Sequence, residues 1–140
     1  MMPKAIYVVI LMMISGCSGV SGRSQTMDFR DFVREFFRSE DFQASHIHFP
    51  LEVISWTGDG GVSSTFVTEN EWSFYEGPAY FQCNESCYDI MIYDDFDKRQ
   101  RDSGERVLAF EGVSNGINSS VYFRLTDGNW YLIKIEDFNN

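Results

Sequence analysis

The feature that most constrains the fold of this chain is a set of large apolar side chains spaced three and four residues apart between residues 29 and 37. They are Phe29, Phe32, Val33, Phe36 and Phe37. This i, i+3, i+4, i+7, i+8 pattern predicts an amphipathic helix over residues 28–38, with charged residues on its other side. Asp28 is suited to cap the first turn of this helix. Because four phenylalanines on one face need a broad apolar partner, the helix should pack across a sheet.

A second short helix is predicted after the first, because Ser39 offers a new N-cap before residues 40–43. The pattern of Thr68 and Glu71 resembles a capping box and predicts another short helix there. Pro50 then favours an extended chain. Strands are predicted at 51–56, 62–67, 88–93, 106–113, 117–125 and 130–136.

Turn residues separate these strands. The run 58–61 is rich in glycine, and Asn115-Gly116 and Asp127-Gly128 are dipeptides that tight hairpins favour. The charged segment 94–105 is interpreted as a solvated turn. The predicted fold class is therefore α+β, with an N-terminal amphipathic helix packed on a curved antiparallel sheet.

The first 27 residues predict export and a lipid anchor. Lys4 precedes the apolar run Ala5–Ile14, and two small residues stand directly before Cys17. As a helix this run would rise only about 15 Å, which is too short for a hydrocarbon core of about 30 Å. The pattern is typical of a bacterial lipoprotein signal peptide, with an ordinary secretory signal as the alternative. We expect a signal peptide at 1–16, a lipidated Cys17 and flexible tether at 17–27, and a single domain at 28–140.

The expected location is the bacterial cell envelope, where the lipid on Cys17 makes the membrane a partner. By resemblance to sorted lipoproteins, Ser18 in place of an aspartate favours the periplasmic face of the outer membrane. The chain has 11 basic and 21 acidic side chains, a net charge of −10. A surface of that sign repels phosphate backbones, which excludes nucleic acid as a partner.

Two further cysteines, Cys83 and Cys87, form an even pair once Cys17 is lipidated. In an oxidising compartment they are predicted to form a local disulfide. A redox pair and half of a zinc site are the alternatives. The two histidines, His46 and His48, would face the same way on an extended segment and could join the thiols in such a site. We predict no metal and no cofactor.

Both ends of the region from about residue 28 to residue 138 carry a family resemblance. Phe36-Phe37, Asp41-Phe42-Gln43, Ile47 and Phe49-Pro50-Leu51 resemble the opening of an uncharacterised family of secreted bacterial lipoproteins, and 121–124 and 128–135 are similar to its last hairpin. His46 stands where that family pattern has an arginine. The resemblance implies the nuclear transport factor 2-like fold, also called the cystatin-like cone. It implies no activity, because the family has none established.

The resemblance also implies a pocket between the curved sheet and its helices. Six aromatic side chains are candidates to line it: Trp56, Trp72, Tyr80, Phe110, Tyr122 and Trp130. Asp94, Asp95 and Asp97 lack the glycine and distal glutamate of a calcium loop, and no spacing defines a catalytic set.

The predicted function is a non-enzymatic binding or interaction module that holds an apolar small molecule or a protein partner. The alternative is an isomerase-like or hydrolase-like enzyme that uses the same pocket. A desolvated carboxylate within hydrogen-bond reach of a tyrosine or histidine would favour catalysis. An exposed apolar patch on the outer sheet would favour a homodimer through the sheet.

Overall fold

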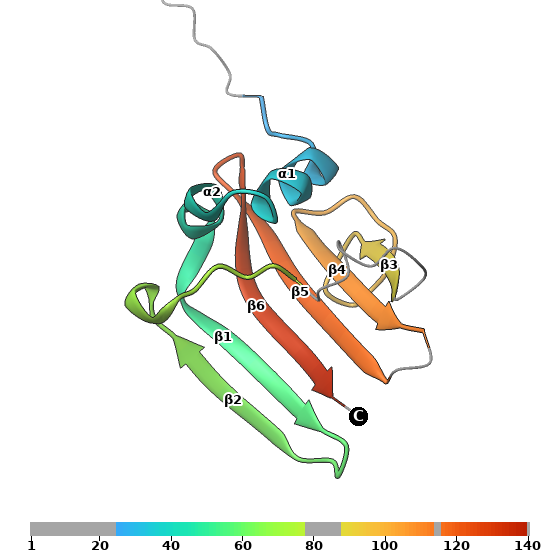
Figure 1. Cartoon of the computed structure of the whole chain (residues 1–140). Coiled ribbons are helices and arrows are strands. Elements are labelled where there is room, and N and C mark those ends of the chain that lie inside the picture. The colour runs from blue at the N-terminus through green and yellow to red at the C-terminus, as the bar shows by residue number, and fades with distance from the viewer. Residues whose placement is uncertain (1–24, 78–87, 114–115, 140) are drawn as a thin grey trace, which may run out of the picture.

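One six-stranded sheet, in the order β2-β1-β6-β5-β4-β3, forms the framework of the protein (Figure 1). The computed structural model describes residues 25–77, 88–113 and 116–139. The strands are β1 (Ile47–Thr57), β2 (Val62–Val67), β3 (Tyr88–Tyr93), β4 (Glu105–Gly112), β5 (Ile117–Thr126) and β6 (Asn129–Asn139). The helices within these residues are α1 (Phe29–Phe36), α2 (Glu40–Ser45) and the 3₁₀ turn η1 (Glu69–Glu71). The α+β class predicted from the sequence is confirmed.

The sheet is mixed, and the exception to the predicted antiparallel order is the pair β1 and β6. These two strands run parallel, whereas the other four strand pairs are antiparallel. Hairpin turns force the neighbours β1–β2 and β5–β6 to be antiparallel, but no short turn links β1 to β6. The first strand also begins at Ile47, earlier than predicted, because Ile47 already pairs with Leu132 of β6.

The predicted caps and the last hairpin turn are present. The Asp28 carboxylate accepts from the Arg30 N–H at 2.9 Å, and the Ser39 hydroxyl accepts from the Phe42 N–H at 3.3 Å. The Glu71 carboxylate accepts from the Thr68 N–H at 3.0 Å, as in a capping box. In the last hairpin, Asp127 and Gly128 both have positive φ. Local sequence therefore determines where these elements begin and end.

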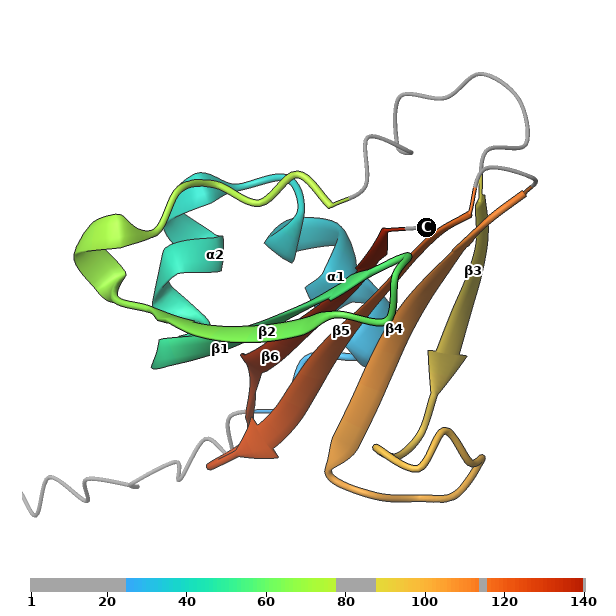
Figure 2. The ribbon, with the colours of Figure 1, turned by 90° about the horizontal axis from the view of Figure 1, so that it is seen from below.

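The apolar face of α1 packs on the concave side of the bent sheet, and the segment after β2 crosses the same side (Figure 2). Phe32 and Phe36 are 1% and 0% exposed, and each lies edge-on to Phe123 of β5, with ring centroids 5.5 and 5.3 Å apart. The rest of this core comes from alternate residues of the strands, including Leu51, Leu108, Phe110, Val121, Leu132 and Ile135. The predicted packing of helix on sheet is confirmed.

The segment between β3 and β4 is more than the solvated turn that was predicted. Asp95 is fully buried, accepts from the Arg99 N–H at 2.8 Å and forms an ion pair with Arg101. These partners lower the pKa of Asp95, the Arg99 hydrogen bond most of all. The prediction was wrong on this residue because a charge pattern does not reveal that a turn folds around one carboxylate.

Replacing Phe36 with alanine should lower the free energy of unfolding by about 3–5 kcal/mol, because a fully buried ring is removed from between α1 and β5. Phe66→Ala is the matched control, since Phe66 is 64% exposed, and it should change the value by less than about 0.5 kcal/mol. Urea unfolding followed by circular dichroism measures both. Equal losses in the two variants would contradict this placement of the core.

Candidate binding hollow on the concave face

The buried side-chain amide of Gln43 holds the chain that follows η1 against the helices. Its Nε2 donates to the carbonyl oxygens of Phe36, at 3.0 Å, and Tyr75, at 2.9 Å. Its Oε1 accepts from the Tyr75 N–H at 2.7 Å. Gln43 has no exposed surface. One side chain therefore links the end of α1 to Tyr75, which lies 32 residues after Gln43 in the chain.

Segment 72–75 closes one side of a hollow of about 260 Å³ on the concave face. Apolar side chains from three adjacent strands line the hollow, namely Val53 on β1, Val67 on β2 and Ile135 on β6. Trp72 lies on the other side and packs edge-on against Phe49, with ring centroids 6.1 Å apart. The hollow thus has an apolar wall built from the sheet and a cover that Gln43 holds in place.

One end of the hollow is polar. The Ser119 hydroxyl donates to Asp137 Oδ1 at 2.5 Å, and the Tyr75 hydroxyl lies 3.4 Å from Ser119 Oγ. Because the Ser119 hydroxyl donates its one proton to the carboxylate, the Tyr75 hydroxyl is the donor in the second contact. Ser119 and Asp137 face each other across β5 and β6, so the sheet register brings them together. The result is a chain of hydrogen bonds from Tyr75 through Ser119 to Asp137.

Burial raises the pKa of Tyr75 to about 12, the Ser119 hydrogen bond opposes that rise, and the nearby Asp137 charge adds to it. Tyr75 therefore stays protonated near neutral pH and remains a hydrogen-bond donor. Across the sheet, burial also raises the pKa of Tyr122, whose hydroxyl donates to Glu136 Oε2 at 2.8 Å.

The structure places five of the six candidate aromatic residues, in three different environments. Trp72 lines the concave hollow. Phe110 and Trp130 are buried in the core, and Trp130 lies edge-on to Phe29 with ring centroids 5.0 Å apart. Trp56 and Tyr122 lie on the opposite face of the sheet, as the alternation of β1 and β5 requires. Tyr80 lies outside the described residues, and so do Cys17, Cys83 and Cys87.

The histidines are held by rings and backbone. His46 stacks on Phe42 with ring centroids 4.0 Å apart, and its Nδ1 lies 2.8 Å from the Phe42 carbonyl oxygen. His48 stacks on Tyr131 at 4.4 Å, and His46 stacks on the same ring at 5.8 Å. Within the described part of the chain, no group of three or more His, Cys, Asp or Glu residues is arranged to hold a metal ion.

Sequence reasoning missed the polar residues of the site, Gln43, Ser119 and Asp137. The sequence identifies Gln43 only as a member of the predicted second helix and of the family motif. Counting residues could not find the other two. Counted back from the Asp127-Gly128 turn, Ser119 would stand opposite Glu136, but a register shift between Tyr122 and Phe123 makes Asp137 its partner. No sequence pattern indicates Tyr75 as a site residue, because it lies outside any strand or helix.

A bent sheet with helices on its concave side and a hollow between them defines a protein of the cone-shaped α+β class. A protein-family model matches residues 27–140 of the chain. The chain belongs to an uncharacterised family of nuclear transport factor 2-like proteins. No curated protein matches it.

Three solved structures are similar to this chain. A nuclear transport factor 2-like protein from Bacteroides fragilis is 24% identical over 80% of this chain and 47% of its own, with a TM-score of 0.57. This chain therefore spans about half the length of that protein. A Bacteroides uniformis protein solved by NMR is 19% identical over 80% of this chain and 77% of its own, with a TM-score of 0.49. A nuclear transport factor 2-like protein from Cytophaga hutchinsonii is 16% identical over 81% of this chain and 100% of its own, with a TM-score of 0.42.

Ultraviolet titration of the wild-type protein should show a tyrosine ionisation step at about pH 12, and this step should be missing in Tyr75→Phe. Asp137→Asn should lower that midpoint, because it removes a negative charge that opposes ionisation. The pKa of Tyr75 is raised on folding, so its contribution to stability is complete below pH 10 and is lost as pH rises toward 12.

The wild type should accordingly lose stability more steeply than Tyr75→Phe between pH 10 and about 12. Parallel pH profiles for the two proteins, together with an unchanged tyrosine titration, would show that Tyr75 is not buried beside Asp137.

Proposed function

We propose that this protein is a lipid-anchored binding module of the bacterial envelope, and that its concave hollow holds a small, largely apolar molecule with one hydrogen-bonding group. The observation that carries the proposal is the division of the hollow into an apolar wall and a polar end. Val53, Val67 and Ile135 supply the wall. The hydrogen-bonded end formed by Tyr75, Ser119 and Asp137 would orient the ligand.

Size and charge narrow the ligand class. A volume of about 260 Å³ is close to the lower end of small-molecule sites, which start at about 300 Å³. Glu71 and Asp137 both line the hollow, and the whole chain carries a net charge of −10. An anionic ligand would therefore be repelled, so the proposed ligand is neutral or cationic.

The alternative function, an isomerase-like or hydrolase-like enzyme, would have to use the same chain of hydrogen bonds. A general base in such a site would have to be a desolvated carboxylate close to an acidic partner. Asp137 is only partly buried, and it meets Tyr75 through Ser119 rather than directly. Tyr75, with a pKa of about 12, is a donor and not a base. These contacts support binding over catalysis.

The proposed anchor rests on the sequence before the fold. Lys4, the apolar run Ala5–Ile14 and Cys17 follow the order of a lipoprotein signal, and all of them lie outside the described residues. Among the helices that the structure describes, none is long and apolar enough to cross a membrane. The periplasmic face of the outer membrane is the location we propose, and a homodimer through the sheet remains a prediction.

Val53→Phe should abolish binding of the neutral fluorescent probe N-phenyl-1-naphthylamine, because the added ring fills the hollow. Ile54→Phe is the matched control: it lies on the same strand but faces the opposite side of the sheet, and it should bind as the wild type does. Fluorescence titration gives both affinities. Loss of binding in both variants, or in neither, would overturn the placement of the ligand in this hollow.

Cells that express the wild-type chain should incorporate labelled palmitate into the protein, whereas Cys17→Ser should not, because it removes the thiol that receives the lipid. Cys83→Ser and Cys87→Ser should label normally. Labelling that persists in Cys17→Ser would contradict the proposed anchor while leaving the proposed binding site untouched.

A further inference from the structure

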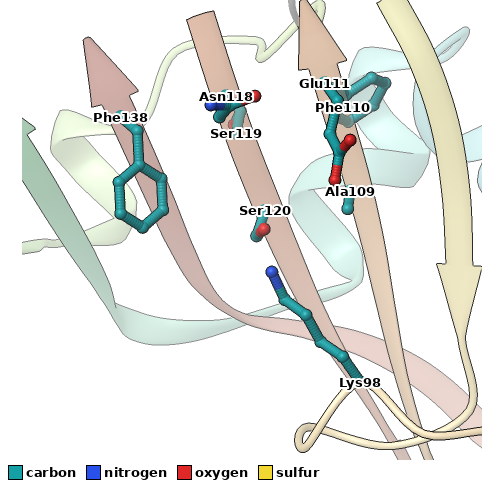
Figure 3. Close-up of a pocket in the computed structure, with 8 residues that line it drawn as sticks. All are labelled: Lys98, Ala109, Phe110, Glu111, Asn118, Ser119, Ser120 and Phe138. Carbon is teal, nitrogen blue, oxygen red and sulfur yellow. The ribbon is translucent and has the colours of Figure 1, made fainter. Parts of the chain in front are cut away.

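A second hollow lies on the outer face of the sheet, on the side away from the helices. Its volume is about 380 Å³, and its lining includes Lys98, Glu111, Asn118, Ser120 and Phe138 (Figure 3). Three consecutive residues of β5, Asn118, Ser119 and Ser120, contribute to it, and Phe138 of β6 lies next to Asp137, which lines the concave hollow. The two hollows therefore lie on opposite sides of one sheet, and Ser119 borders the outer hollow while its hydroxyl bonds to Asp137 on the concave side.

The cationic group of this hollow comes from an ordered turn. Lys98 has φ of 58°, and its N–H donates to the Asp95 carbonyl oxygen at 3.1 Å. Asp95 itself is fully buried. From this turn the Lys98 side chain extends toward Ser120 on β5 (Figure 3). Holding Lys98 in a left-handed conformation places an ammonium group over the sheet, where a polar ligand can reach it.

A row of side chains crosses the outer face at the same end of the sheet. Cross-strand pairing sets its members side by side in the order Val62, Trp56, Phe138, Asn118, Glu111 and Asp89. Trp56 and Phe138 stack with ring centroids 5.4 Å apart and an interplanar angle of 10°, and Trp56 is 36% exposed. Half of the row is thus apolar and half is polar.

The combination of groups indicates the class of ligand. Asn118 and Ser120 both donate and accept, Lys98 donates, and Glu111 accepts, so the hollow offers both kinds of hydrogen-bonding group. The rings of Phe138 and Trp56 offer an apolar surface beside them. A sugar ring presents hydroxyl groups around its edge and C–H groups on its faces, which matches this arrangement. The net charge of −10 disfavours an acidic sugar.

We propose that the outer-face hollow binds a neutral saccharide, with its hydroxyl groups on Asn118, Glu111 and Lys98 and a sugar face against Phe138. A second copy of the chain is a poorer occupant. A two-fold dimer through this face would bury the carboxylates of Glu52, Glu111 and Asp89 from both copies, at a cost in desolvation and repulsion.

The test uses the full chain, purified in lauryldimethylamine oxide so that the detergent carries no sugar. Calorimetric titration is carried out with cellohexaose, mannohexaose and chitohexaose as neutral probes, and with a heparin hexasaccharide as the anionic probe. Asn118→Ala removes a hydrogen-bonding amide from the outer-face hollow, and Phe138→Leu removes the aromatic ring that would contact the sugar face. Asn70→Ala and Phe66→Leu are the matched controls, since Asn70 lies in η1 and Phe66 on the edge strand β2, and both are exposed.

We expect saturable binding of at least one neutral probe, weakened by about tenfold or more in Asn118→Ala and Phe138→Leu and unchanged within about twofold in both controls. Val53→Phe should also bind the saccharide normally, which separates this proposal from the concave site. Binding of no neutral probe, binding of heparin alone, or equal affinity in wild type and Asn118→Ala would overturn it. The proposal would also be overturned if the protein bound no saccharide and formed a dimer that Phe138→Leu dissociates. Asn118 is exposed, so its substitution should leave the fold intact even if Phe138→Leu unfolds the protein.

Discussion

The concave site depends on one buried amide. Gln43 pairs with the backbone of both Phe36 and Tyr75, and it uses both its donor and its acceptor to do so. A buried backbone group left without a partner costs about 1–3 kcal/mol, so three such groups make the contact hard to open. Segment 72–75 is thereby held over the sheet, Trp72 closes the hollow, and the Tyr75 hydroxyl comes within reach of Ser119. Without this amide, the fold would still have its phenylalanine core, but its concave side would be an open groove.

The period-two alternation of the strands gives the protein two different faces. Neighbouring residues go to opposite sides: Asp137 lines the concave hollow, whereas Phe138 lines the outer hollow. The concave side is apolar with one polar end, whereas the outer side carries a row that is half apolar and half polar. This division lets one small sheet offer an apolar ligand and a hydroxyl-rich ligand separate places to bind.

Much of the fold could be predicted because its local signals agree with its packing. The phenylalanine spacing of α1, the caps at Asp28 and Ser39 and the turn at Asp127-Gly128 all act over a few residues, and the structure has each of them. The parallel pairing of β1 with β6 could not be predicted in this way, since it joins segments about eighty residues apart. The polar site residues could not be predicted for the same reason: Gln43 and Tyr75 are 32 residues apart in the sequence, and Ser119 and Asp137 are 18 apart. Aromatic content alone could not separate Trp72, which lines the concave hollow, from Trp130, which fills the core.

Hydrogen–deuterium exchange of segment 72–75 in wild type and Gln43→Leu tests the central claim most directly, because the Tyr75 N–H is itself bonded to the Gln43 oxygen. The account predicts slow exchange of this segment in the wild type and fast exchange in the variant, with α1 and β5 still protected because the phenylalanine core remains. Gln43→Glu should fall between them, since it keeps the acceptor and loses both donated bonds. Equal protection of segment 72–75 in wild type and Gln43→Leu would contradict the account.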